Sequence, residues 1–493
     1  MSARVYGNWR RPRSAGMWGF GTLPLGILMG GSALAAFVSE QRGLLVGVAV
    51  MVMVLIVVLP MRVLDRYGRN LWQRVAWRVA WHLGRARGQG LYHSGPLARI
   101  GHGTHSLPGL ASGIEALEAF DGLHRPFALL WHRAVNHVSV VIEVAADGAA
   151  LLDDNEVDMR VAAWGDWLAG LGYQAGLVGA SVTVEAAPDP GIRLRREVES
   201  HVVPESPPFA RQVMAEIVDG YPQGSASIST RIALTWSMMG RGTRRTRSIE
   251  ELAVDVGHRL PDLTSALAGT GAGPGRPMTV SEVAAAIRVA YEPGVHEWVE
   301  AGGADEAAVS WTECGPRCQE EHSGYMGHDG AWSISWEMGK EPRGMVLSSV
   351  LAPLLRPHPK LARKRVTILY RLHDPATASQ VVERDYRDAM FTNSNSRGLH
   401  AGQRLAAGQA ERAAQEEAQG AGLTRFALVA TATVTNRADL DEATAIVEDL
   451  GLGARMALRR AWGSQAGMFA AGLPLGIVVP AHLRIPEHIR ELA

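Results

Sequence analysis

Two long runs without charged residues, close to the N-terminus, constrain this chain more than any other feature. The first extends from Met17 to Val38 and the second from Gly43 to Met61. At 1.5 Å per residue, each would form a helix of about 30 Å, which matches the hydrocarbon core of a bilayer. Because only four polar residues separate the runs, the two helices must be antiparallel. We therefore expect a transmembrane helical hairpin within residues 1–67.

The placement of arginine predicts the orientation of this hairpin. Arginines precede the first run and follow the second, whereas the connecting turn carries one arginine beside one glutamate. Cytoplasmic loops carry the excess of basic residues, so both termini are expected in the cytoplasm of a multi-pass plasma-membrane protein. The side chains expected at the membrane interface are Arg10, Arg11, Arg13, Arg62, Arg66, Trp72, Arg74, Trp77, Arg78 and Trp81.

Residues 68–100 are predicted to form a basic interfacial helix and a linker. Between residues 69 and 87, Arg74, Arg78 and Arg85 fall on one side of a helical wheel, and the tryptophans supply rings that favour the headgroup region. A soluble helix that packs on the following domain is the alternative.

A secretory signal peptide is the alternative to the hairpin. The chain starts with basic residues, an apolar run follows, and residues 33–35 (Ala-Leu-Ala) resemble a cleavage site. Cleavage there would leave the second apolar run as an N-terminal membrane anchor and would export the rest of the chain. The first run is long for a signal peptide, which favours the hairpin.

Charge is distributed unevenly along the chain. Residues 1–100 contain 13 arginines, no lysine and two acidic residues, whereas the whole chain has 49 basic and 49 acidic residues. The other 393 residues therefore carry 36 basic and 47 acidic side chains. A basic head suits an anionic membrane surface, and an acidic remainder argues against nucleic acid as its main partner.

The remainder alternates strand-like and helix-like segments. Phe127–Trp131 and His137–Ala145 predict a β-hairpin, and a helix is predicted from Asp154 to Leu171. A similar order returns after residue 331. We expect an α+β fold with two domains, 101–294 and 331–493, joined by an irregular loop at 295–330. Each domain would have a mixed or antiparallel, split β-α-β-like sheet covered by helices. The repeated order raises the hypothesis of an internal duplication.

No catalytic or cofactor-binding signature stands out, and we predict that the protein is not an enzyme. The run from Gly269 to Pro277 lacks the lysine and hydroxyl residue of a phosphate-binding loop, so a solvated linker is predicted. Two basic runs, Arg241–Arg247 and Lys360–Arg365, offer charge for nucleic acid or an acidic partner. Neither contains the aromatic residues of a single-strand binding face, and both are interpreted as solvated turns. Binding of nucleic acid stays open.

The only two cysteines, Cys314 and Cys318, are followed by His322 and His328. Two thiolates and two imidazoles form a common zinc ligand set. The spacing differs from that of a standard zinc knuckle, however, and two incidental thiols in a loop are the alternative. We predict no metal, and these four residues are the candidates should one be bound.

Several strings resemble an uncharacterised actinobacterial family of integral membrane proteins, which is encoded in conjugation-like, type IV secretion-like gene clusters. The resemblance covers nearly the whole chain. The strings that carry it are Arg125–Leu130, Val161–Gly165, Gly179–Glu185, Leu260–Pro261, Leu267–Pro274, Arg363–Thr367, Gly463–Gln465, Phe469 and Leu473–Gly476.

The layout is also similar to the two-helix inner-membrane subunit of type IV secretion systems, fused to the N-terminal, non-motor domain of their conjugation ATPase. Gln465, Phe469 and Leu473-Pro474 match the segment that leads into that motor, although Leu475 interrupts its Pro-Gly pair. The chain ends at Ala493, before a motor would begin.

The resemblance implies a non-catalytic assembly subunit, a homo-oligomer, that docks a separately encoded P-loop ATPase among other secretion-machine subunits. A membrane subunit of a type VII secretion apparatus and a membrane-anchored metal-binding protein are the alternatives.

Overall fold

The computed structural model describes residues 22–62, 69–95, 98, 105–148, 151–203, 205–220, 226–239, 246–306, 309–342, 346–373, 375–395, 401–418 and 424–483. Contacts divide the chain into two compact units. The first, here called the body, consists of Met1–Tyr6, Gly88–Leu372 and Thr424–His482. The second, the helical unit, consists of Gly7–Arg87, His373–Leu423 and Leu483–Ala493.

Two consecutive helices of the helical unit, α1 (Thr22–Arg42) and α2 (Leu44–Arg62), pack against each other as a hairpin. Glycines allow the close approach: a Cβ added to Gly31 would lie 2.6 Å from the Val54 side chain. Within the described residues one helix, at Leu44–Met61 in α2 with a mean hydropathy of 3.0, is long and apolar enough to cross a membrane.

The expectation of two membrane spans is therefore supported for α2 alone. The described part of α1 is less apolar, because its last turn contains Glu40, Gln41 and Arg42. The first residues of the expected span, 17–21, lie outside the described residues.

The predicted helix after the hairpin is confirmed as α3 (Leu71–Ala86). Asn70 and Gln73 form a capping box at its start. The Trp72 indole donates a hydrogen bond of 2.8 Å to the carbonyl of Val57 in α2, which ties the two helices together. Two further helices of this unit, α11 (Pro375–Asn395) and α12 (Ala401–Ala418), pack as a second hairpin. The side chains of Arg10, Arg11, Arg13, Arg62 and Arg66 lie outside the described residues.

The body is built on one sheet of 13 strands, and each of its described pairings is antiparallel. Its main order is β1-β8-β9-β10-β12-β11-β5-β6-β4-β3-β2, while β13 pairs with β10 and β7 with β4. The strands are β1 (Leu91–His93), β2 (Ile114–Phe120), β3 (Pro126–His132), β4 (His137–Val144), β5 (Leu177–Pro188), β6 (Ala226–Ser237), β7 (Gly275–Pro277), β8 (Cys318–Glu321), β9 (Met326–His328), β10 (Ala331–Lys340), β11 (Arg363–Leu372), β12 (Thr424–Val434) and β13 (Ala457–Arg460).

The α+β class and the antiparallel sheet are thus confirmed, but the two expected domains share that sheet. Pairing of β5 with β11 joins the strands of residues 101–294 to those of 331–493. This arrangement removes two open sheet edges that separate domains would expose. Residues 295–330, expected to be an irregular loop, contain α9 (His296–Glu306), β8 and β9.

The two halves of the sheet repeat one order of elements, which supports the hypothesis of duplication. Each half begins with a hairpin of two strands, followed by a helix and a third strand. A helical hairpin, a fourth strand and another helix come next. The half ends with a short strand, which pairs with the second strand of the hairpin, and a final helix. In the first half the helices are α4 (Asp154–Leu171), α5 (Ile192–His201), α6 (Pro208–Gly220), α7 (Ile249–Ser265) and α8 (Val280–Tyr291). In the second half they are α10 (Ala352–Leu355), α11, α12, α13 (Leu440–Gly453) and α14 (Gln465–Ala471).

Hydrogen bonds reproduce this repeat in detail. Thr183 of β5 pairs with Thr367 of β11, and an approximate two-fold axis through this pair exchanges the halves. Directly after each short strand, β7 or β13, one backbone N–H donates a hydrogen bond to the second strand of the hairpin, β4 or β10. Met278 N–H donates to the Val141 carbonyl at 2.8 Å, and Ala461 N–H donates to the Ser335 carbonyl at 3.0 Å.

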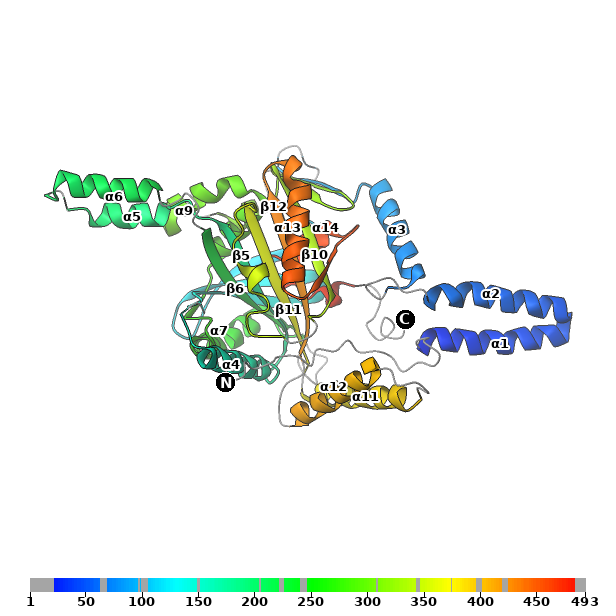
Figure 1. Cartoon of the computed structure of the whole chain (residues 1–493). Coiled ribbons are helices and arrows are strands. Elements are labelled where there is room, and N and C mark those ends of the chain that lie inside the picture. The colour runs from blue at the N-terminus through cyan, green and yellow to red at the C-terminus, as the bar shows by residue number, and fades with distance from the viewer. Residues whose placement is uncertain are drawn as a thin grey trace. The chain divides into compact units, whose positions relative to one another are not determined.

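Helices cover the sheet on both faces (Figure 1). On the outer face, α4 and α7 bury apolar residues against the first half, and α10 and α13 do so against the second. On the inner face, α8 and α14 pack in one core together with the segment from Leu473 to Ile477. The inner face carries the polar residues described next.

Candidate functional site

A line of buried hydroxyl groups crosses the inner face of the sheet, and we call it the polar seam. Alternate residues of each strand point to the same face, so hydroxyl groups from six consecutive strands, β10-β12-β11-β5-β6-β4, share this face. Thr183 Oγ1 lies 3.1 Å from Thr367 Oγ1 at the centre. The remaining hydroxyl pairs, with their Oγ–Oγ1 distances, are Ser139–Thr235 at 2.9 Å, Ser333–Thr433 at 2.8 Å and Ser335–Thr431 at 2.9 Å.

The segment from Gln465 to Ile477 closes the polar seam from the inner side. Thr367 Oγ1 donates to the Gly472 carbonyl at 2.8 Å, and Thr235 Oγ1 donates to the Gly476 carbonyl at 2.7 Å. The buried Gln465 amide accepts from Ser335 N–H at 2.8 Å and donates to the Ser335 carbonyl at 3.2 Å. Its side chain thereby replaces a missing neighbouring strand.

A buried histidine stands beside the seam in each half. His132 Nε2 lies 2.9 Å from Ser139 Oγ, and His328 Nε2 lies 2.7 Å from Ser333 Oγ. Burial lowers the pKa of His132 to about 3 and that of His328 to about 4, so both imidazoles are neutral at pH 7. A Ser–His pair resembles an activated nucleophile. These side chains are at most 3% exposed, however, and each serine hydroxyl already contacts a threonine hydroxyl, so we assign them a structural role.

Charged side chains lie beside the central Thr183–Thr367 pair of the seam. Glu185 Oε1 accepts a bond of 2.6 Å from Arg363 Nη1, and Arg231 Nη1 lies 3.5 Å from Glu185 Oε2. Burial alone would raise the pKa of Glu185, but the charges of the arginines and the bond from Arg363 lower it to about 2. The guanidinium of Arg365 stacks over the Phe469 ring at 4.7 Å.

The interpretation of the basic run 360–365 as a solvated turn is wrong for its last three residues. Arg363, Lys364 and Arg365 belong to β11 and are at most 6% exposed. Lys364 Nζ donates to the Arg356 carbonyl at 2.6 Å on the outer face, and burial lowers its pKa to about 8. The strand is internal to the sheet, which is why its charges are buried. Lys360 alone is exposed, in an ion pair with Glu442.

The other basic run is described only at its end. Arg247 pairs with Asp255 at 3.0 Å and donates to the Ser237 carbonyl at 3.0 Å. Arg241, Arg244 and Arg245 lie outside the described residues.

The glycine-rich run 269–277 is only partly the linker that was expected. Its last three residues form β7, which pairs with β4. Gly273 has φ of +73°, and a Cβ there would lie 1.8 Å from the Ala145 carbonyl oxygen. Glycine at this position therefore permits contact between backbone segments and gives no indication of phosphate binding.

The four candidate metal ligands do not converge. Cys314 is buried, and burial raises the pKa of its thiol to about 12, whereas Cys318 is exposed. The His322 ring stacks on Tyr325, and both His328 nitrogens already have partners, Ser333 and the Tyr291 carbonyl. Within the described part of the chain, no three His, Cys, Asp or Glu side chains are grouped as a metal site.

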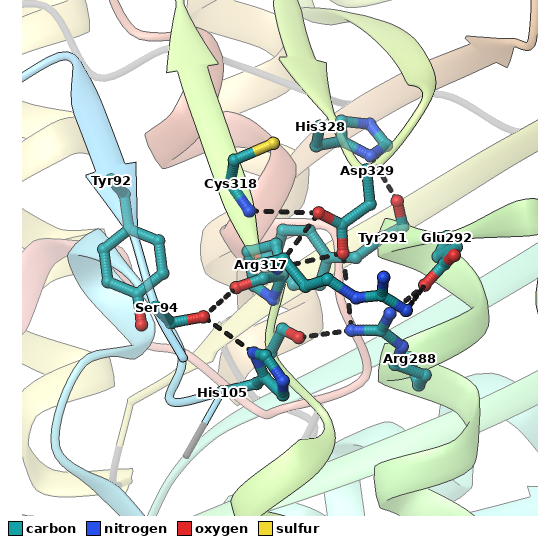
Figure 2. A network of polar contacts seen from close by, with 12 residues as sticks. Tyr92, Ser94, His105, Arg288, Tyr291, Glu292, Arg317, Cys318, His328 and Asp329 are labelled. Carbon is teal, nitrogen blue, oxygen red and sulfur yellow. Dashed lines mark hydrogen bonds and ion pairs between the residues drawn. The ribbon is translucent and has the colours of Figure 1, made fainter. Parts of the chain in front are cut away.

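An ion network takes the place of that site around the cysteine loop (Figure 2). The buried Asp329 carboxylate accepts the backbone N–H groups of Arg317 and Cys318, each at 3.0 Å, and Arg288 Nη1 lies 3.3 Å away. Arg288 also donates to the Gly315 carbonyl at 2.7 Å. Ser94, from the segment that enters the body, donates to the Pro316 carbonyl at 2.6 Å. The network fixes the loop and gives it a structural role.

Helices α5 and α6 form an arm that projects from the sheet of the body (Figure 1). Arg196 Nη2 attaches the arm to α9 by donating to the carbonyl of Ala301 at 2.6 Å. An apolar groove of about 350 Å³ lies on the arm, lined in part by Val198, Val202, Ala210 and Met214. Phe209 is 77% exposed and Ile217 53% exposed beside it. Sequence reasoning did not predict this exposed apolar surface, whose signal is Phe209 directly after Pro207-Pro208.

A family model described as a domain of unknown function (DUF8461) matches residues 13–73, which include α1, α2 and the start of α3. No curated protein matches the sequence.

Some of the sequence strings singled out above lie at the seam. Gly179–Glu185 lies in β5, Arg363–Thr367 in β11, and Phe469 and Leu473–Gly476 in the segment that closes the seam. The chemistry available there is hydrogen bonding and charge in a buried setting.

Proposed function

We propose that this protein is a non-catalytic, membrane-anchored assembly subunit of a conjugation-like, type IV secretion-like machine, and that its body docks a separately encoded P-loop ATPase. In this proposal the hairpin of α1 and α2 spans the plasma membrane twice, both termini are cytoplasmic, and α3 lies at the membrane surface. The subunit forms homo-oligomers and contacts other subunits of the machine.

The exposed apolar surface of the α5–α6 arm is the observation that carries the docking proposal. Phe209 and Ile217 place large apolar side chains in solvent on a projecting element, beside a groove with apolar walls. Such surfaces favour an amphipathic partner segment over water. The apolar α2, with Leu45 86% and Met53 69% exposed, supports anchoring in lipid.

Affinity purification of the tagged full chain from native membranes in mild detergent tests the proposal. We expect a stoichiometric P-loop ATPase together with conjugation or secretion proteins, identified by mass spectrometry. Type VII secretion components in its place would reassign the machine. Recovery of the protein alone, also after crosslinking, would refute the docking role.

A pair of matched variants then locates the docking surface. Phe209→Ser with Ile217→Ser removes the apolar surface of the arm and should abolish recovery of the ATPase. Leu123→Ser with Leu452→Ser removes two leucines that are 63% and 70% exposed elsewhere on the body, and it should leave recovery unchanged. Equal recovery with both double variants would exclude the arm as the docking surface.

A further inference from the structure

The charged cluster beside the centre of the polar seam contains more positive than negative charge. Among the residues that the structure describes, Arg231, Arg363 and Arg365 surround one carboxylate, that of Glu185. Glu185, Arg363 and Arg365 are 5%, 6% and 3% exposed, and the Arg231 side chain is 13% exposed. Arginine keeps its charge in proteins, so this nearly dry cluster has an excess of about two positive charges.

The N–H groups of these arginines are also incompletely bonded. Nε of Arg231 and Arg363, and both Nε and Nη2 of Arg365, are buried and have no hydrogen-bond partner within the described part of the chain. Buried charged donors without acceptors are strongly unfavourable, and native proteins normally satisfy them.

The other acidic side chains in this region have partners of their own. Asp189 Oδ1 accepts the Gly191 N–H at 2.8 Å, and Glu300 Oε1 pairs with Arg193 at 2.7 Å. Glu300 Oε2 has no hydrogen-bond partner among the described residues. Burial lowers the pKa of the neighbouring His296 to about 4, so it adds no charge at pH 7.

The arginines of the cluster lie on one side of the approximate two-fold axis and are not repeated on the other. The residues that correspond to Arg363 and Arg365 on β5 are Gly179 and Ser181, and Val429 on β12 corresponds to Arg231. The duplicated scaffold therefore does not require these arginines, which argues that they serve a separate purpose.

We propose that Arg231, Arg363 and Arg365 form a binding site for a tetrahedral oxyanion of the phosphate type, which completes the cluster beside Glu185. Guanidinium groups present paired N–H donors that match the oxygens of such an anion. The partly exposed Arg231 forms the entrance, and Arg365, held over Phe469, forms the inner wall. The inference is independent of the docking role proposed above.

Titration of the detergent-solubilised full chain with inorganic phosphate tests the site. We expect saturable heat of binding in isothermal calorimetry and a rise in melting temperature that exceeds the effect of sodium chloride at equal ionic strength. A response to phosphate no larger than that to chloride would overturn the proposal.

Three variants make the test specific. Arg365→Met should weaken phosphate binding by at least about tenfold, because it removes charge-assisted donors. Lys364→Met removes the next cation along β11, which faces the opposite side of the sheet, and should leave the affinity within about twofold of wild type. Glu185→Gln removes the competing negative charge and should tighten binding.

Circular dichroism reports whether each variant is folded. If Arg365→Met does not fold, the wild-type titration and Glu185→Gln still decide the matter. Unchanged or weaker phosphate binding by folded Glu185→Gln would contradict an anion site beside that carboxylate.

Discussion

The two halves of the body sheet, from β3 to α8 and from β9 to α14, share their order of elements and their buried contacts but differ in charge. Each has a buried histidine beside a serine–threonine pair and a backbone bond to the central hairpin strand. Glu185 of β5, in contrast, stands where β11 has Leu369, and Arg365 of β11 stands where β5 has Ser181. The comparison separates the hydrogen bonds that both halves need to form the sheet from the charged residues that are present on one side alone.

The shared features satisfy backbone and hydroxyl groups, which any buried sheet of this kind requires. The unshared features cost desolvation energy, which burial of an ion pair does not always recover. Substitutions at corresponding positions of the two halves therefore distinguish scaffold from site, and four tests follow in decreasing order of expected effect.

The largest effect is expected for Glu185→Leu, which installs on β5 the residue type found at the corresponding place on β11. The substitution leaves three buried arginines without their carboxylate, and the free energy of unfolding should fall by about 3–5 kcal/mol. Urea denaturation of the solubilised chain measures it. Glu442→Leu, which breaks the exposed pair with Lys360, is the control and should leave stability near that of wild type. Equal costs for the two variants would show that Glu185 is dispensable.

The second prediction concerns pH and the histidines that both halves share. Each has a lower pKa in the folded state than the ordinary 6.5, so protonation favours the unfolded chain. Their contribution to stability is complete above pH 6.5, and it is lost as the pH falls toward about 4 for His328 and about 3 for His132. The slope of the free energy of unfolding against pH reports how many protons the chain takes up on unfolding. That number should fall by up to about one in each of the variants His132→Gln and His328→Gln. A slope unchanged in both variants would contradict their assignment as buried neutral groups.

Local patterns predicted the local elements of this fold. The predicted hairpin corresponds to β3 and β4, and the predicted helix 154–171 has the bounds of α4, because alternation and capping signals act over a few residues. The β5–β11 pairing joins residues almost two hundred positions apart, and no local signal encodes it. The same long-range pairing buries Arg363–Arg365, which in sequence resemble a solvated run.

The sequence did not predict the candidate site. The strings Gly179–Glu185 and Arg363–Thr367 were noted as family-like, yet their side chains meet only because two strands pair in register. Cys314 and His328 are the opposite case, since ligand-like residue types lie near one another in sequence while hydrogen bonds and burial give each a separate role.

A third, smaller effect is expected at the starts of α8 and α14. Gln465 follows Ala461 by four residues, as Glu282 follows Met278, so the two side chains occupy corresponding places. Gln465→Leu leaves the buried Ser335 N–H without an acceptor and should cost about 1–3 kcal/mol. Glu282→Leu removes a half-exposed capping contact and should cost about 0.5–1 kcal/mol. Urea denaturation of both variants gives the comparison, and a larger cost for Glu282→Leu would argue against the strand-like role of Gln465.

The smallest effect tests the axis itself, where identical residues should have unequal costs. Thr367 Oγ1 donates its only proton to the Gly472 carbonyl and can therefore only accept from Thr183. Thr367→Val removes both bonds and should cost about 1–2 kcal/mol, whereas Thr183→Val leaves the bond to Gly472 intact and should cost about 0.5–1 kcal/mol. The double variant should cost less than the two single variants together, because both lose the Thr183–Thr367 bond. Thr367→Val and Thr183→Val could instead cost the same free energy of unfolding, with the double variant costing their sum. That result would mean that the segment from Gln465 to Ile477 does not break the symmetry of the seam.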